Sequence, residues 1–220
     1  MGKGAGMEKL RNLIVFFIRN FPRPLTRTEL VKLLYLFEYE QVQIQGHQYS
    51  EVTFVRDKYG PFVSSILAES DSLCSAGIIN CNRYDIDSDC ILYEYTVSDP
   101  IKAAQYDLPE WEKGIALTLI DRTARLSLKQ IKELAYSTPP MVEILKKEAE
   151  LGYLLLSRGI NMEKGNTPKK FTKKELAAAK RRLDTSPDRG SDDEYLAAFL
   201  DTYKEFENLR RRATECLLQN

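Results

Sequence analysis

Three aspartates at alternate positions, Asp85, Asp87 and Asp89, have types and spacing that could bind a metal ion. Carboxylates spaced in this way begin the calcium-binding loop of an EF-hand. That loop also needs glycine at its sixth position and glutamate at its twelfth, where this sequence has Cys90 and Thr96. We therefore expect a solvated polar turn here, and no metal site.

Other patterns for metal or covalent chemistry are also missing. The sequence has four cysteines without a CxxC pair and one histidine, His47, so a zinc site is not expected. It contains no P-loop, no dinucleotide-binding glycine fingerprint, and neither a hydrolase nor a zinc-protease motif. We expect no cofactor and no enzyme activity, although the many carboxylates leave open an unfamiliar site built from coupled acids.

Composition indicates a folded protein. The chain has 220 residues, of which 43% are hydrophobic and 29% charged. Its net charge is zero, whereas nucleic-acid-binding proteins usually carry an excess of basic residues. The longest apolar run, Leu13 to Ile18, is far shorter than the roughly 18–20 residues of a membrane span. No export signal is visible at the start, so we expect a cytoplasmic protein with reduced thiols and no membrane association.

Apolar periodicity and boundary residues predict helix, helix, short strand, helix and β-hairpin in the first half of the chain. Thr26 with Glu29 is a capping-box pattern, Gly46 is a plausible helix end, and Pro61 suits the first position of the third helix. The expected bounds are 8–20, 26–46, 52–55 and 61–76, with hairpin strands 78–84 and 91–97 around a polar turn at 85–89. This order predicts a mainly α fold with a small β-hairpin (α+β), winged-helix-like in its N-terminal core and followed by a helical part.

The second half of the chain is predicted to be helical. Ser127 with Gln130 is a second capping signal. The expected helices are 111–124, 128–136 and 141–156. We therefore divide the chain into a flexible N-terminus at 1–7, a domain at 8–156 (core 8–98, helical extension 101–156) and a charged helical tail at 157–220, with helices at 172–183 and 193–217 that could pair as a hairpin.

The charge of the tail changes sign along its length. Residues 151–182 hold nine Lys or Arg and two acids, whereas residues 184–207 hold eight acids and two bases. The basic stretch is the candidate nucleic-acid site, and its alternative interpretation is a solvated face that neutralises the acidic helix after it. The candidate residues are Lys169, Lys170, Lys173, Lys174, Lys180, Arg181 and Arg182.

We do not expect the winged-helix-like unit itself to recognise a DNA base sequence. The helix that would enter the major groove, 61–76, contains Glu69 and Asp71 and no Lys or Arg. The hairpin that would act as the wing is also acidic. Contacts to phosphate need cations at the surface, so these acids oppose DNA binding.

Aromatic residues gather between positions 35 and 62. They either form a tyrosine-rich core or, where exposed beside Arg56 and Lys58, a patch for binding another protein. The sequence leaves both interpretations open. The residues are Tyr35, Phe37, Tyr39, Tyr49, Phe54, Tyr59 and Phe62.

Two short motifs resemble the Panacea domain of SocA-like antitoxins. One is Lys32-Leu-Leu-Tyr35-Leu-Phe37, and the other runs from Phe54 through Arg56 to Tyr59-Gly60-Pro61-Phe62. In that family a helix of the first kind is followed by a strand and a Gly-Pro turn. YwgA-like proteins share this outline. The resemblance covers about residues 8–150, and the tail after about 155 has no counterpart in it.

The resemblance implies a bacterial or phage protein that is not an enzyme and neutralises a toxin encoded nearby by direct binding. An adaptor role, in which the toxin is delivered to a protease, belongs to the same family. The residues expected to form the partner-binding surface or its scaffold are Lys32, Tyr35, Arg56, Tyr59, Gly60, Pro61 and Phe62. In this view the tail provides toxin specificity or self-association as a homodimer. The alternative is a DNA-binding transcription regulator that uses residues 158–182.

Overall fold

The computed structural model describes residues 3–50, 52–87, 90–163, 177–178, 180–181, 191, 193–194 and 196–201. The chain divides into two compact units, Met1–Thr167 and Pro168–Asn220. In the second unit the described residues 177–178, 180–181, 193–194 and 196–201 are helical. The predicted tail helices lie mostly outside the described residues, and the elements below all belong to the first unit.

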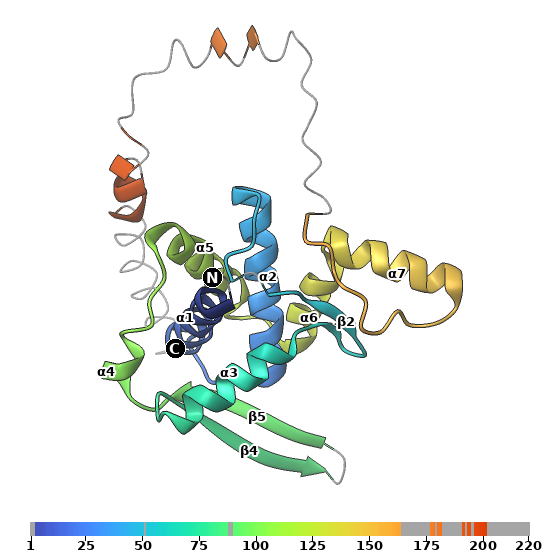
Figure 1. Ribbon diagram of the computed structural model, residues 1–220, viewed down its shortest axis with the longest axis horizontal. Helices are drawn as coiled ribbons and strands as arrows, with labels where there is room; N and C mark the ends of the chain where they lie inside the picture. The colour runs from blue at the N-terminus through green and yellow to red at the C-terminus, as the bar shows by residue number, and fades with distance from the viewer. Residues whose placement is uncertain are drawn as a thin grey trace, which may run out of the picture. The chain divides into compact units, whose positions relative to one another are not determined.

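Helix α2 (Arg27–Gln45) is the centre of the first unit. Its residues from Glu29 to Phe37 are all buried, and a helix that is buried on every side must be covered by neighbours on every side. Helix α1 (Lys3–Asn20), α5 (Glu110–Thr123) and α6 (Leu128–Ser137) contact it. Figure 1 shows α6 and α7 (Pro139–Leu151) on the side of α2 that carries strand β2 (Val55–Asp57).

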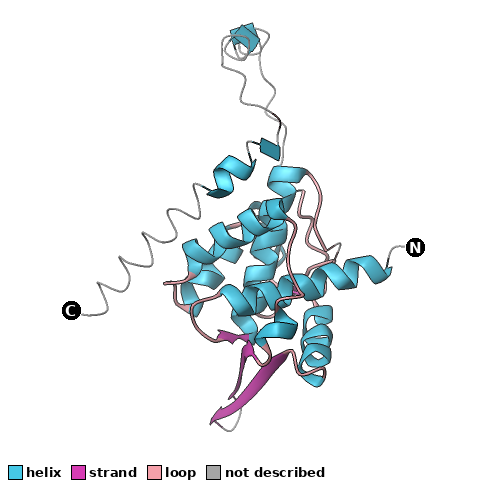
Figure 2. Ribbon diagram, turned by 90° about the vertical axis from the view of Figure 1, so that its left-hand side faces the viewer, coloured by secondary structure: helices cyan, strands magenta, loops and turns pink. Residues whose placement is uncertain are grey.

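A three-stranded antiparallel sheet lies against the helices in the order β1-β5-β4. Its strands are β1 (Leu25–Thr26), β4 (Ile79–Asp87) and β5 (Cys90–Val97). Leu25 pairs with Tyr95, and Ile79 pairs with Val97. Helix α3 (Ser64–Ser75) contacts β4, while the short helix α4 (Pro100–Ala103) follows the sheet. Figure 2 shows the β4–β5 hairpin extending away from the helices.

The second sheet corrects two predicted elements. Strand β2 is at 55–57, where we predicted 52–55, and it pairs with β3 (Gly60–Phe62). Pro61 lies in β3, opposite Arg56, and does not start the third helix, which begins at Ser64. Proline is tolerated in an edge strand because the N–H that it lacks would face away from the partner strand.

The ends of other helices and strands also differ from the prediction. Helix α1 begins at Lys3, and strand β4 continues through Asp87, where a polar turn was predicted from residue 85. Helix α7 ends at Leu151, and Gly152, with φ of +77°, ends it in the left-handed conformation that glycine favours. The structure confirms the mainly α class with a small antiparallel sheet, while the winged-helix-like interpretation stays a prediction. No helix in the described part of the chain is both long and apolar enough to span a bilayer.

Candidate protein-binding site

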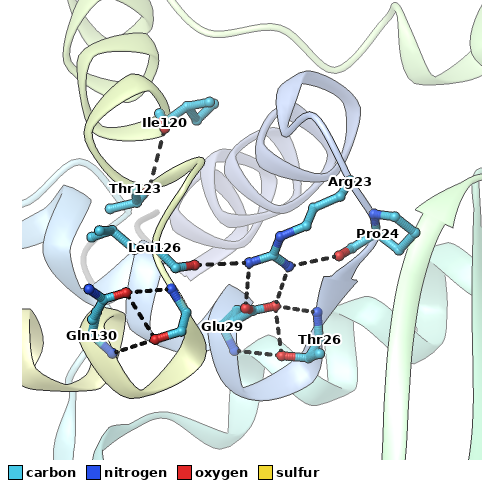
Figure 3. A network of polar contacts seen from close by, with 9 residues as sticks. Arg23, Pro24, Thr26, Glu29, Ile120, Thr123, Leu126 and Gln130 are labelled. Atoms are coloured by element: carbon cyan, nitrogen blue, oxygen red, sulfur yellow. Dashed lines mark hydrogen bonds and ion pairs between the residues drawn. The ribbon is translucent and has the colours of Figure 1, made fainter. Parts of the chain in front are cut away.

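A network of polar contacts fixes the start of α2, as Figure 3 shows. Thr26 and Glu29 form the predicted capping box, with the Glu29 carboxylate accepting from the Thr26 amide at 3.0 Å. Arg23 donates to both carboxylate oxygens at 2.7 and 3.0 Å, and to the Leu126 carbonyl at 3.3 Å. Burial raises the pKa of Glu29, but hydrogen bonds from Arg23 and Thr26 outweigh it and leave that pKa lowered. The network therefore ties α2 to the loop before α6.

Tyr35 is fixed in the core between α2 and α6. Its ring meets Phe54 edge-on, with centroids 5.4 Å apart, and the side chain is fully buried. The Thr138 hydroxyl donates to the Ala135 carbonyl at 2.8 Å, so it accepts from the Tyr35 hydroxyl at 2.6 Å. Burial raises the pKa of Tyr35, which keeps the phenol a neutral donor. Tyr35 thus acts as scaffold.

Lys32 lies one turn before Tyr35 and is buried as well. Its Nζ donates to the Pro61 carbonyl at 2.7 Å, and no described carboxylate lies within ion-pair distance of it. Burial and the neighbouring Lys132 charge lower the pKa of Lys32 to about 7. Arg56 adds to this effect, and Asp57 opposes it. The lysine therefore holds β3 against α2, and burial without an ion-pair partner disfavours its charged form.

Arg56 joins β2 to the helices after the sheet. It forms a bidentate ion pair with Glu148 of α7, at 2.9 and 3.1 Å, and its guanidinium lies 5.7 Å from the centre of the Tyr136 ring. Its backbone amide donates to the Arg158 carbonyl at 2.8 Å, and its carbonyl accepts from the Ser157 amide at 2.7 Å. The hydrogen bond from Arg56 lowers the pKa of Glu148, against the opposing effect of burial. The pair locks α7 and the chain after it onto β2.

Gly60 lets the β2–β3 hairpin approach α6 closely. Its φ is +98°, a conformation that other residues rarely adopt. A Cβ atom at this position would lie 3.0 Å from two carbons of the Tyr136 ring. Glycine is therefore required here both by the backbone angle and by the packing.

Tyr59, at the tip of this hairpin, is 59% exposed. The Nζ atoms of Lys58 and Lys132 lie 5.5 and 5.8 Å from the centre of its ring. Lys132 also lines an open pocket of about 410 Å³ whose described lining residues all belong to α6. The pocket is lined by Leu128, Lys129, Lys132, Glu133 and Tyr136.

The structure brings the seven predicted partner-binding residues together around this hairpin. Tyr59 is exposed and Phe62 is half-buried, whereas the other five are buried. The set is therefore one exposed aromatic side chain on a scaffold made by its neighbours. The five buried residues are Lys32, Tyr35, Arg56, Gly60 and Pro61.

Sequence reasoning missed the contribution of α6 and α7. Lys132, Tyr136 and Glu148 complete the site, although they lie more than 70 residues after Tyr59 in the sequence. One signal was available, because Leu128, Lys132 and Tyr136 are spaced four residues apart and so form one stripe of a helix. Nothing in the sequence showed which segment this stripe faces.

The other predicted sites are only partly described. Of the seven basic tail residues, Lys180 and Arg181 are described, and both are exposed and helical. In the first unit, Glu69 of α3 forms an ion pair with Arg11, and Arg83 of the hairpin pairs with Asp85 at 3.0 Å. The described residues contain no group of three metal-binding side chains, and the described lining of the α6 pocket includes one carboxylate, that of Glu133.

The fold and the site together define a mainly helical domain that presents an aromatic hairpin beside a basic pocket. The family model described as "Antitoxin SocA-like, Panacea domain" matches residues 30–140, half of the chain, and the protein belongs to this family. Membership indicates a role of the toxin–antitoxin kind. Neither the search of curated proteins nor the search of solved structures gave a match.

Proposed function

We propose that this protein is an antitoxin or adaptor that neutralises or delivers a cognate toxin by binding it directly, without catalysing a reaction. The family supports a toxin as the partner. The observation that carries the proposal is the exposed Tyr59 on a hairpin whose base is held by Lys32, Arg56 and Gly60. Aromatic anchors that are already ordered dominate many protein interfaces, because little conformational entropy is lost when they bind.

The experiment that tests this proposal is a growth assay. The open reading frame next to this gene is induced alone and then together with this protein. Growth arrest by the neighbour, relieved by co-expression, is the expected result. A harmless neighbour, or arrest without relief, contradicts the proposal. Co-purification of the two chains then shows whether neutralisation involves a direct complex, and toxin abundance on an immunoblot separates blocking from delivery to a protease.

A matched pair of variants locates the interface. Tyr59→Ala is expected to weaken the complex about tenfold or more, as loss of an interface anchor does. Tyr84→Ala is the control, because Tyr84 is also an exposed tyrosine, 47% exposed, on the β4–β5 hairpin. Both variants should melt like the wild type. Equal effects of the two substitutions on binding exclude the Tyr59 hairpin as the contact surface.

The alternative function, transcription regulation through the basic segment 158–182, rests on the charge of that segment. It predicts binding to duplex DNA that falls steeply with salt concentration. It also predicts loss of this binding when Lys169, Lys170, Lys173 and Lys174 are changed to Gln. A fluorescent duplex that stays free at low salt rules out this alternative.

A further inference from the structure

The α6 pocket has walls of apolar character. Leu128 and the Tyr136 ring contribute apolar surface, and the lysines that line the pocket add their aliphatic stems. Its volume of about 410 Å³ lies within the roughly 300–1,000 Å³ of ligand pockets. An apolar group of a bound molecule therefore fits the interior.

The rim of the pocket is basic. Lys129 and Lys132 line it, and Lys58 stands near the same Tyr59 ring as Lys132. None of these three lysines forms an ion pair with a described carboxylate, and Glu133 is the one acid among the described lining residues. The rim therefore offers unpaired positive charge around an apolar centre, which is the complement of an acidic ligand.

Lys32 adds a second, independent observation. Its ammonium group is buried behind Pro61 with a carbonyl as its hydrogen-bond partner, although buried charges are normally paired. The charge of Lys132 repels it. An anion seated on Lys132 would cancel this repulsion and would therefore favour the protonated form of Lys32.

We propose that this pocket binds an acidic segment of the partner protein, with an apolar side chain inserted against Tyr136 and carboxylates on Lys58, Lys129 and Lys132. This inference rests on the proposed function and names the kind of toxin surface that is recognised. The apolar interior favours a peptide over a small polyanion, because a small polyanion has no apolar group that could fill it. Helix α3 carries Glu69 and Asp71 and no Lys or Arg, which disfavours a nucleic acid on that face of the unit.

The test uses the full chain and fluorescein-labelled peptides of matched length, read by fluorescence anisotropy. The probe peptide alternates Asp and Glu with Leu and Phe. One control peptide has Asn and Gln in place of the acids, and the other has Ser in place of the apolar residues. We expect saturable, salt-sensitive binding of the probe peptide alone. The proposal is overturned if no peptide binds, or if either control binds as tightly as the probe.

Charge-reversal variants locate the binding. Lys129→Glu combined with Lys132→Glu is expected to weaken binding of the probe peptide by at least about tenfold. The matched control combines Lys102→Glu with Lys146→Glu, two exposed lysines outside the pocket lining that give the same change in net charge. Equal losses in the two double variants mean that net charge alone attracts the peptide, which contradicts the proposal.

Competition identifies other occupants. ATP or a DNA duplex that displaces the probe peptide at equal concentration makes the pocket a site for polyanions or nucleic acid, and the proposal fails. The chain's own acidic segment is tested by changing Asp192, Asp193 and Glu194 to Asn, Asn and Gln. If the probe peptide binds this variant and does not bind the wild type, that segment is the occupant and the proposal is wrong.

The growth assay separates this inference from the proposed function. If the wild type neutralises the toxin and the Lys129/Lys132 double variant does not, the proposed function and the pocket inference are both supported. If both proteins neutralise equally well, the pocket is not the contact and the toxin-binding function survives. If the wild type does not neutralise, the function fails, while binding of the probe peptide that depends on Lys129 and Lys132 still supports the ligand class.

Discussion

Arg56 and Glu148 form a bidentate ion pair across 92 residues of sequence, with Nε–Oε1 and Nη2–Oε2 distances of 2.9 and 3.1 Å, and both side chains are buried. Glu148 Oε1 also accepts from the Leu155 amide at 2.9 Å. The pair therefore connects the family's second motif to Glu148, which lies beyond the matched residues 30–140. Through it, the chain after α7 contributes to the scaffold under Tyr59.

Breaking this pair should destabilise the protein strongly. Glu148→Ala leaves a buried guanidinium without its counter-ion, which costs about 3–5 kcal/mol of the free energy of unfolding. Asp85→Ala is the control, because it removes the partner of the exposed Arg83 and should change stability by less than about 1 kcal/mol. Urea denaturation measures both. Similar midpoints for the two variants would show that the Arg56–Glu148 pair contributes no more than a surface pair.

Gly60→Ala should also be destabilising. The substitution forces alanine to a φ of +98° and places its Cβ against the Tyr136 ring, so we expect a loss of about 1–3 kcal/mol. Gly114→Ala is expected to do the opposite, because Gly114 lies within α5 with open space around it, and alanine favours a helix by about 0.5–1 kcal/mol. Thermal melts of the two variants should therefore shift in opposite directions. Unchanged stability of Gly60→Ala would mean that the hairpin can move away from α6.

Local boundary signals predicted much of the fold. Both capping boxes, Thr26 with Glu29 and Ser127 with Gln130, are present, because a capping box is made by residues that are neighbours in sequence. Pro61 misled for the same reason. A proline suits the first position of a helix, but Pro61 lies in β3 and its carbonyl accepts from Lys32 of α2, a contact that the local sequence does not show.

The end of α7 and the composition of the site needed information from distant segments. The predicted helix 141–156 continues past the true end of α7, because the chain turns at Gly152 and the residues after it hydrogen-bond to β2. Lys32 and Tyr35 were predicted to belong to the partner-binding surface or its scaffold, and their burial depends on contacts with α6 and β3 that are distant in sequence. Helical periodicity shows which residues share one face of a helix, and tertiary packing decides whether that face is buried or exposed.

Cys74 should react slowly with alkylating agents in the folded protein. Burial, followed by the neighbouring Cys81 and Asp71, raises the pKa of the Cys74 thiol to about 11. At pH 8 only about one thiol in a thousand is then ionised, and the thiolate is the nucleophile. Iodoacetamide labelling followed by mass spectrometry should show slow modification that accelerates about tenfold per pH unit up to pH 10. The same cysteine in urea is the control, and equal rates in the two states would contradict the prediction.

Lys32 should make the stability of the protein depend on pH. The unfolded chain keeps the lysine proton up to about pH 10.4, whereas in the folded protein the pKa of Lys32 is about 7. Between these values the unfolded state binds more protons, so this group makes the free energy of unfolding rise with pH, by up to about 1.4 kcal/mol per pH unit.

Lys32→Met removes this slope, and it also leaves the Pro61 carbonyl without its donor, which costs about 1–3 kcal/mol at every pH. Urea denaturation at several values between pH 6 and 10 separates the two effects, because only the titration changes with pH. The free energy of unfolding of the wild type should rise relative to that of Lys32→Met as the pH increases. The substitution of the exposed Lys146 by Met should leave the pH dependence of the wild type unchanged. If the stability of Lys32→Met also runs parallel to that of the wild type, the lysine stays protonated throughout this range, which contradicts a lowered pKa.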